Sequence, residues 1–180
     1  GIMSIPGEGP DRPPLKCGPP LSDITAGILA AMGILAAYTH RLKTGEGQWV
    51  ETSLFEAALV QTYWQSAIAF ATGRAPVAMG SAHPLNAPYQ AFHASDRWIV
   101  VGGANQKNWL KMLEAIGASE LADDPRFRTN PDRMAHLREL ERELGERFAT
   151  KPAQHWLDAL DRAGVPSGIV NDMLQALDDP

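Results

Sequence analysis

The sequence has little of what builds disulfide-rich, metal-binding or nucleic-acid-binding proteins. Its 180 residues include one cysteine, Cys17, which excludes an intramolecular disulfide and any site made from several cysteines. The five histidines lack the paired spacing of metal ligands. The formal net charge is −5, whereas a dedicated nucleic-acid binder usually carries a basic stripe. We therefore expect neither a metal nor a nucleic-acid partner, and the lone cysteine suits a reducing, cytoplasmic location.

Long hydrophobic runs are also scarce. The longest, residues 26–38, has 13 residues and falls short of the roughly 20 that span a bilayer. Residues 1–20 are rich in proline and glycine and lack the order of a signal peptide, basic and then apolar. We expect no transmembrane segment and no membrane partner. Residues 1–20 show no apolar periodicity, and the sequence stops just after an apparent helix, so we also expect a piece of a longer protein.

The first half predicts long helices around one strand. Ser22 or Asp23 can cap a helix that continues to about Lys43, where cations followed by a glycine form a helix stop. Apolar residues lie nearly all round this helix, which predicts that it is buried. Residues 48–53 predict a short strand, and the apolar spacing of residues 54–71 predicts a second long helix.

The second half predicts a small α+β unit. Residues 89–92 and 98–101 predict two strands, paired antiparallel around a turn at Asp96 and Arg97. Apolar stripes and helix-stop glycines then predict helices over residues 109–116, 130–148 and 150–164, a short strand over 167–170 and a last helical turn over 173–177. The division predicted is residues 1–75, a linker or loop over residues 76–88, and residues 89–180.

Asp23 is the first candidate functional residue. Free backbone amides and the positive end of the helix dipole keep a carboxylate ionised at a helix N-terminus. Such a carboxylate can attack an activated acyl group, with the amides as an oxyanion hole. The commoner role of an aspartate here is to cap its helix. The residues alone leave both interpretations open.

The segment Gly80–Asn86 is the second candidate. It contains a glycine, Ser81, His83 and a side-chain amide in irregular sequence, so it can close over a site. The alternative is an ordinary linker in which His83 satisfies local hydrogen bonds. Composition and spacing do not separate the two interpretations.

Three stretches of the first half form a recognisable pattern: residues 18–27 (GPPLSDITAG), residues 33–37 (GILAA) and residues 44–48 (TGEGQ). Together they resemble the family III CoA-transferases of the CaiB/BaiF type. Residues 83–92 (HPLNAPYQAF), with Asn130, Arg133 and residues 124–127 and 164–166, are similar to the members that act on dicarboxylic acids. The resemblance implies part of an α/β fold. Residues 1–75 would belong to a Rossmann-like, CoA-binding lobe with the catalytic helix, and residues 89–180 to a small α+β domain.

The resemblance also implies a reaction. Asp23, followed by Gly27, matches the family's nucleophile, which passes CoA from an acyl-CoA to a free carboxylic acid through an aspartyl-CoA thioester. Gly80, Ser81 and His83 would belong to a loop that shields the intermediates, with no metal involved. Coenzyme A would be bound as a substrate, mostly by residues that precede the catalytic aspartate and lie outside this sequence. The full-length protein would be an interlocked homodimer, and the present chain alone would be inactive.

Two other functions remain open. A 2-methylacyl-CoA racemase of the same fold is the nearer one, although the residues Thr25-Ala26-Gly27 look more like a transferase. The other is a non-catalytic remnant or interaction module that uses the fold for assembly.

Overall fold

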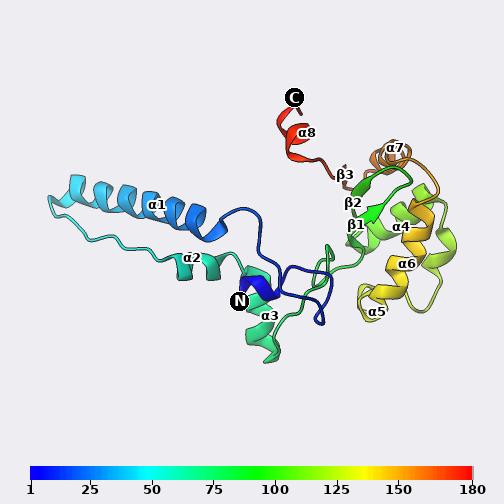
Figure 1. Ribbon diagram of the computed structural model, residues 1–180, viewed down its shortest axis with the longest axis horizontal. Coiled ribbons are helices and arrows are strands. Elements are labelled where there is room, and N and C mark those ends of the chain that lie inside the picture. The colour runs from blue at the N-terminus through cyan, green and yellow to red at the C-terminus, as the bar shows by residue number, and fades with distance from the viewer. Residues whose placement is uncertain (180) are drawn as a thin grey trace. The chain divides into compact units, whose positions relative to one another are not determined.

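The computed structural model describes residues 1–179 and divides into two compact units, Gly1–Gly80 and a second from Ser81 onward (Figure 1). The boundary falls inside the predicted linker over residues 76–88. The helices of the first unit are η1 (Ile2–Ser4), α1 (Leu21–Thr44), α2 (Leu54–Val60) and α3 (Tyr63–Thr72).

Helix α1 has the predicted limits to within two residues but not the predicted burial. It ends at Gly45, whose φ of 82° is left-handed and whose N–H donates to the Arg41 carbonyl. Only Thr25 and Ala26 are buried along it, so the prediction of a buried helix is wrong within the described chain. Start and stop signals in the sequence define where the helix lies. Burial, however, requires other elements that cover the helix, and within the described chain they bury only two residues of α1.

Of the described helices, α1 alone is long and apolar enough to cross a membrane. Its 24 residues have a mean hydropathy of 1.6 over the most apolar 18-residue window, and 6% of that window is buried. The 13-residue run understates the apolar length of the helix, because Leu21, Ile24 and Leu42 add apolar positions on both sides of it. The core helix of a soluble protein passes the same test, so these values do not assign a membrane location.

The predicted strand over residues 48–53 is wrong. The segment is extended but pairs with no strand among the described residues. Instead it runs back along α1 (Figure 1), where Thr52 Oγ1 donates to the Ala26 carbonyl at 3.4 Å. Val50 packs so closely on Gly33 that a Cβ there would lie 2.7 Å from Val50 Cγ1. The β-branched side chains of Val50 and Thr52 therefore pack against a helix instead of a neighbouring strand.

The predicted second helix is broken in two. Helix α2 ends at Val60 and α3 begins at Tyr63. At the break, the Leu59 carbonyl accepts two hydrogen bonds from Thr62, one from its N–H at 3.0 Å and one from its Oγ1 at 2.7 Å.

The second unit is a three-stranded antiparallel sheet with helices against one face. Strands β1 (Tyr89–His93), β2 (Trp98–Gly102) and β3 (Ser167–Ile169) lie in the order β1-β2-β3, and Phe92 pairs with Ile99. The predicted pairing of the first two strands is confirmed. The helices are α4 (Gln106–Ile116), η2 (Ser119–Ala122), α5 (Asn130–Ala135), α6 (Leu137–Phe148), α7 (Ala153–Ala163) and α8 (Met173–Leu177).

The core of this unit lies between the sheet and α4, α6 and α7 (Figure 1). Alternate strand residues, such as Phe92 and Ile99, point into it, and from the helices Trp109, Leu144 and Leu160 are no more than 1% exposed. Each such side chain contributes roughly 1.5–3 kcal/mol by leaving water. The unit therefore has a closed core of its own.

Helix α5 begins at the predicted residue, Asn130, and is capped by Thr129 in a capping box with Asp132. Helix α7 begins at Ala153, after Pro152, and not at residue 150 as predicted. The single helix predicted over residues 130–148 is divided at His136.

Candidate active site

The carboxylate of Asp23 is exposed and does not cap its helix. Asp23 is the third residue of α1, the N-cap is Pro20, and no side chain makes a capping hydrogen bond there. Its Oδ2 accepts a hydrogen bond from Ser22 Oγ at 3.1 Å. Both capping predictions, for Ser22 and for Asp23, are therefore wrong. The first turn still places the anion at the positive end of a 24-residue helix.

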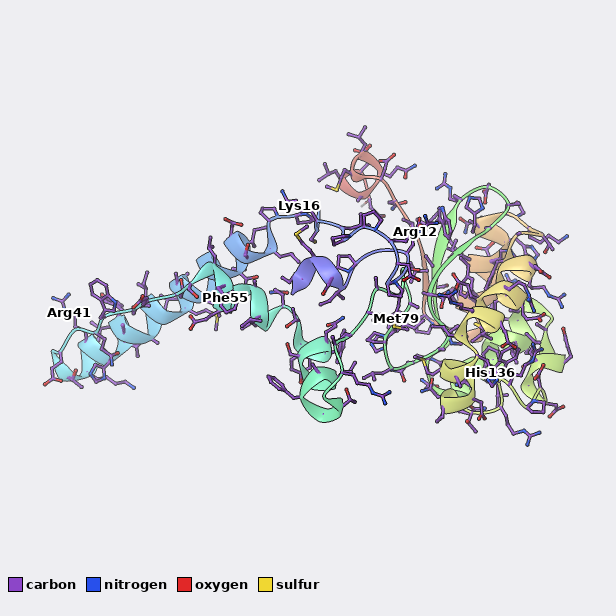
Figure 2. The ribbon with its side chains drawn as sticks, turned by 60° about the horizontal axis from the view of Figure 1, so that its bottom comes forward. Arg12, Lys16, Arg41, Phe55, Met79 and His136 are labelled. Atoms are coloured by element: carbon purple, nitrogen blue, oxygen red, sulfur yellow. The ribbon has the colours of Figure 1, made fainter. Side chains whose placement is uncertain are left out.

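A cavity of about 400 Å³ lies beside Asp23 within the first unit. That volume is within the range of small-molecule sites, roughly 300–1,000 Å³. Its wall is mostly apolar, with Phe55 and Leu59 from α2, while Lys16 and Cys17 come from the segment before α1. Figure 2 labels Lys16 and Phe55, two of the residues that line this cavity. The lining of the cavity thus includes the Asp23 carboxylate, an apolar surface and the side chain of Lys16.

The predicted loop residues are divided between the two units. Gly80 closes the first unit with a left-handed φ of 63°, and its N–H donates to the Gly7 carbonyl at 2.7 Å. Ser81 opens the second unit, where its Oγ accepts the Ala91 N–H of β1 at 2.9 Å. Asp23 and Gly80 therefore belong to the first unit, whereas Ser81 and His83 belong to the second.

His83 is half-buried and held in a defined orientation. Its ring stacks on Tyr89, with centroids 5.3 Å apart and planes 5° from parallel. Its backbone N–H donates to the Tyr89 carbonyl at 2.9 Å. Its Nδ1 accepts the Leu85 N–H at 3.1 Å. Burial lowers the pKa of His83 below its usual value, because desolvation disfavours the imidazolium ion.

Helix α5 anchors the end of the same segment. Asn130 Oδ1 accepts the Ala87 N–H at 3.0 Å, and its Nδ2 donates to the Leu85 carbonyl at 2.9 Å. Arg133 Nε donates to the Ala87 carbonyl at 2.6 Å. The segment that carries His83 is therefore tied to β1 at one side and to α5 at the other.

Arg133 is a buried cation whose described hydrogen-bond acceptors are carbonyl oxygens. It is 0% exposed, and desolvation lowers its pKa to about 10. Its Nη1 donates to the Phe127 carbonyl at 3.0 Å and to Gln106 Oε1 at 3.1 Å, and the guanidinium lies 4.9 Å from the centre of the Trp109 ring.

Sequence reasoning gave Asn130 and Arg133 no place in the site. The available signal was their spacing of three, which puts both side chains on one face of one helical turn. The described residues contain no cluster of three or more histidine, cysteine, aspartate or glutamate side chains able to hold a metal ion.

Comparison with known proteins places the chain in a family. CoA-transferase family III matches residues 1–180, so the chain belongs to that family. It is 38% identical, over 100% of its length, to the acetyl-CoA:oxalate CoA-transferase of Acetobacter aceti, of which it covers 46%. It is 31% identical to the succinate–glutarate CoA-transferase of Agrobacterium fabrum, of which it covers 45%.

Solved structures show the same fold. A CaiB/BaiF family protein from Brucella suis superposes with a TM-score of 0.81 at 36% identity, over 100% of this chain and 47% of that one. The protein Rv3272 of Mycobacterium tuberculosis gives 0.84 at 25% identity, over 99% of this chain and 46% of that one. Mixed helices with a small antiparallel sheet are thus part of the family III fold, and the chain spans about half the length of the relatives it matches.

Proposed function

We propose that the protein transfers CoA between an acyl-CoA and a free carboxylic acid, with Asp23 as the covalent nucleophile. The observation that supports this most is the exposed Asp23 carboxylate in the first turn of α1, not used as a cap and beside a cavity. In a chain of family III, a carboxylate so placed is available for acyl chemistry.

The proposed reaction is a series of exchanges at carbonyl carbon. A carboxylate oxygen of Asp23 attacks the thioester carbon of the acyl-CoA. The C–S bond breaks, CoA departs as a thiolate, and a mixed anhydride of Asp23 and the acyl group remains. The thiolate then attacks the Asp23 carbonyl of that anhydride, which releases the first acid and leaves an aspartyl-CoA thioester. The acceptor carboxylate then attacks the aspartyl-CoA thioester and displaces CoA as a thiolate, which gives a second mixed anhydride. The thiolate attacks the acceptor's carbonyl carbon in that anhydride, which forms the new acyl-CoA and restores the free carboxylate of Asp23.

The loop residues Gly80, Ser81 and His83 are proposed to cover these intermediates. A mixed anhydride is readily hydrolysed, so a site of this kind has to exclude water. Support comes from the resemblance of residues 83–92 to family members and from the contacts that give the segment a defined shape.

The proposed acceptor is a dicarboxylic acid. The names of the relatives include oxalate, succinate and glutarate as acids that they use. In the cavity beside Asp23, the cation of Lys16 suits the second carboxylate of such an acid, and the apolar wall suits its methylene groups.

The remaining expectations concern the whole protein. We propose a cytoplasmic, interlocked homodimer, with CoA bound as a substrate. Because the chain spans about half of its relatives' length, we propose that these 180 residues alone are inactive.

The test is to trap the covalent intermediate. Full-length protein is mixed with an acyl-CoA, the reaction is quenched, the protein is digested, and the peptides are analysed by mass spectrometry. A CoA adduct is expected on the peptide that contains Asp23. Asp23→Asn should lose the adduct and reduce exchange by several orders of magnitude, since an amide cannot form the anhydride. Asp11→Asn, a change at another exposed carboxylate of the same unit, is the control and should keep both. Near-normal exchange by a folded Asp23→Asn protein would refute the proposal.

A second assay of the full-length protein distinguishes a CoA-transferase from a racemase. A racemase exchanges the C2 proton of its acyl-CoA with solvent and needs no free acid. Deuterium uptake at C2 without acid-dependent CoA transfer would favour it.

A further inference from the structure

The part of α2 that borders the cavity beside Asp23 is a single stripe of the helix surface. Phe55, Ala58 and Leu59, with Thr62 just beyond the end of α2, line the cavity at spacings of three and four, which place side chains on one side of a helix. Exposure falls along this stripe, from 73% at Phe55 through 47% at Leu59 to 6% at Thr62. The stripe therefore runs from the mouth of the cavity to its floor.

The floor at Thr62 offers no free donor to an anion. Thr62 Oγ1 donates to the Leu59 carbonyl at 2.7 Å, so its one hydroxyl proton is already used, and Ser66 Oγ is its second partner. The side chains of Ala58 and Leu59 contain only carbon. Because a carboxylate buried without a donor is costly, this end of the cavity suits methylene groups and disfavours a second carboxylate.

Lys16 is a cation without a partner in the described chain. It is exposed and lines the same cavity, and no hydrogen bond or ion pair among residues 1–179 involves its ammonium group. The neighbouring cation Arg12 differs, because it pairs with Glu8 at 3.6 Å. The cavity therefore offers an unpaired positive charge at an exposed position and an apolar stripe that leads inward.

We propose that Lys16 and the α2 stripe select the acceptor acid: Lys16 binds the second carboxylate, and Ala58 sets how many methylene groups fit. The proposal rests on the proposed function. Ala58 is the smallest side chain of the stripe and lies between Phe55 at the mouth and Thr62 at the floor, so its size limits the space between them. Both are specificity-determining residues, because neither forms or breaks a bond. Selectivity then depends on two separable properties, charge at Lys16 and volume at Ala58.

The first test removes the charge in the full-length protein. Glutarate and pentanoate share a chain of the same length, but pentanoate has a methyl group in place of the second carboxylate. With one acyl-CoA donor throughout, Lys16→Met should lower kcat/KM for glutarate by about tenfold, mainly through KM, and should not lower it for pentanoate. Lys43→Met, at the other end of α1, is the control and should leave the ratio of the two acids unchanged.

Charge reversal distinguishes a selective contact from a structural role. The acid 4-aminobutyrate has the methylene groups of glutarate and an ammonium in place of the second carboxylate. Lys16→Glu should shift the ratio of kcat/KM for 4-aminobutyrate over glutarate by about a hundredfold, because it replaces one attraction by the opposite one. A Lys16→Glu protein that loses both acids equally, or a Lys16→Met protein with unaltered selectivity, would refute the role of Lys16.

The third test changes the volume. In the series succinate, glutarate and adipate, each added methylene that fits along the stripe should lower KM by about fourfold, through burial of apolar surface. Ala58→Leu should abolish that gain for the longer acids, and Ala58→Gly, the opposite change, should favour adipate over succinate. Ala67→Leu, at an exposed alanine of α3, is the control. The same chain-length profile in wild type, Ala58→Leu and Ala58→Gly would refute the role of Ala58.

Failure of this proposal differs from failure of the proposed function. If the wild-type protein forms no CoA adduct on Asp23, the proposed function fails. If the adduct forms, and the preference for glutarate over pentanoate survives in Lys16→Met, the function stands and only the proposal on selectivity fails.

Discussion

The two units of the chain differ in how completely they bury their apolar side chains. In the second unit, one face of a sheet and three helices enclose a core in which Phe148 and Leu160 are 0% exposed. In the first, Leu35 and Phe70 are 66% and 90% exposed. Both units show clear helical periodicity in sequence. The difference teaches that such a pattern predicts the helix itself, whereas burial depends on which other elements are present to pack against it.

The largest expected difference is in truncations of leucine. Leu144→Ala, at 0% exposure in α6, should reduce the free energy of unfolding by about 2–5 kcal/mol, because it leaves a cavity in a closed core. Leu35→Ala, at 66% exposure in α1, should change it by less than about 0.5 kcal/mol. Urea denaturation of the 180-residue chain, followed separately for each unit, measures both. Equal losses would show that α1 is covered in solution.

A second pair of variants tests the one close contact along α1. Gly33→Ala brings a Cβ to 2.7 Å from Val50 Cγ1, and displacing that side chain should cost about 1–3 kcal/mol. Gly27→Ala, in the same helix with nothing within 4 Å, should instead stabilise by up to about 1 kcal/mol through helix propensity. Thermal unfolding of the two variants should shift in opposite directions. Shifts of the same sign would place residues 48–53 away from α1.

Local signals explain how much of the fold could be predicted. The hairpin of β1 and β2 and the ends of α1 and α4 follow from alternation, stop glycines and turn residues, which act over a few positions. The exposure of α1 could not be predicted that way, because it depends on residues distant in sequence. The strand predicted at residues 48–53 failed for the same reason, since β-branched residues suit any flat apolar surface and the surface here is a helix.

The residues of the candidate site also differ in whether local sequence patterns could predict them. Asp23 and His83 were found from sequence because a carboxylate at a helix start and a histidine in a glycine-containing loop are local patterns. Asn130 and Arg133 lie more than forty positions from the backbone atoms they hold, Leu85 and Ala87. Sequence spacing carries no information on such a contact, so their place beside the loop required the structure.

The pH dependence of stability should come from the second unit. Hydrogen bonds from Arg126, first through its side chain, hold the pKa of Asp124 below its usual value. A carboxyl with a lowered folded-state pKa stabilises the fold above its unfolded-state pKa, and that stabilisation is lost as pH falls through the folded-state value. Acid titration should therefore reduce the stability of this unit progressively below about pH 4. Arg126→Gln should flatten that dependence while leaving the first unit's unchanged. An unaltered acid transition in Arg126→Gln would refute the assignment.

The smallest expected effects compare how the helices of the two units begin. Thr129 caps α5, with its side chain accepting the Asp132 N–H, and Thr129→Ala should cost about 1 kcal/mol. Ser22 stands at the start of α1 without a capping hydrogen bond, so Ser22→Ala should change stability by no more than a few tenths of a kcal/mol. Ser22 Oγ does donate to Asp23 Oδ2, so the same variant should be assayed for its effect on the Asp23 adduct. A loss of stability in Ser22→Ala as large as that in Thr129→Ala would mean that Ser22 caps α1 after all. A stable Ser22→Ala protein with a slower adduct would instead assign the hydroxyl to orienting the nucleophile.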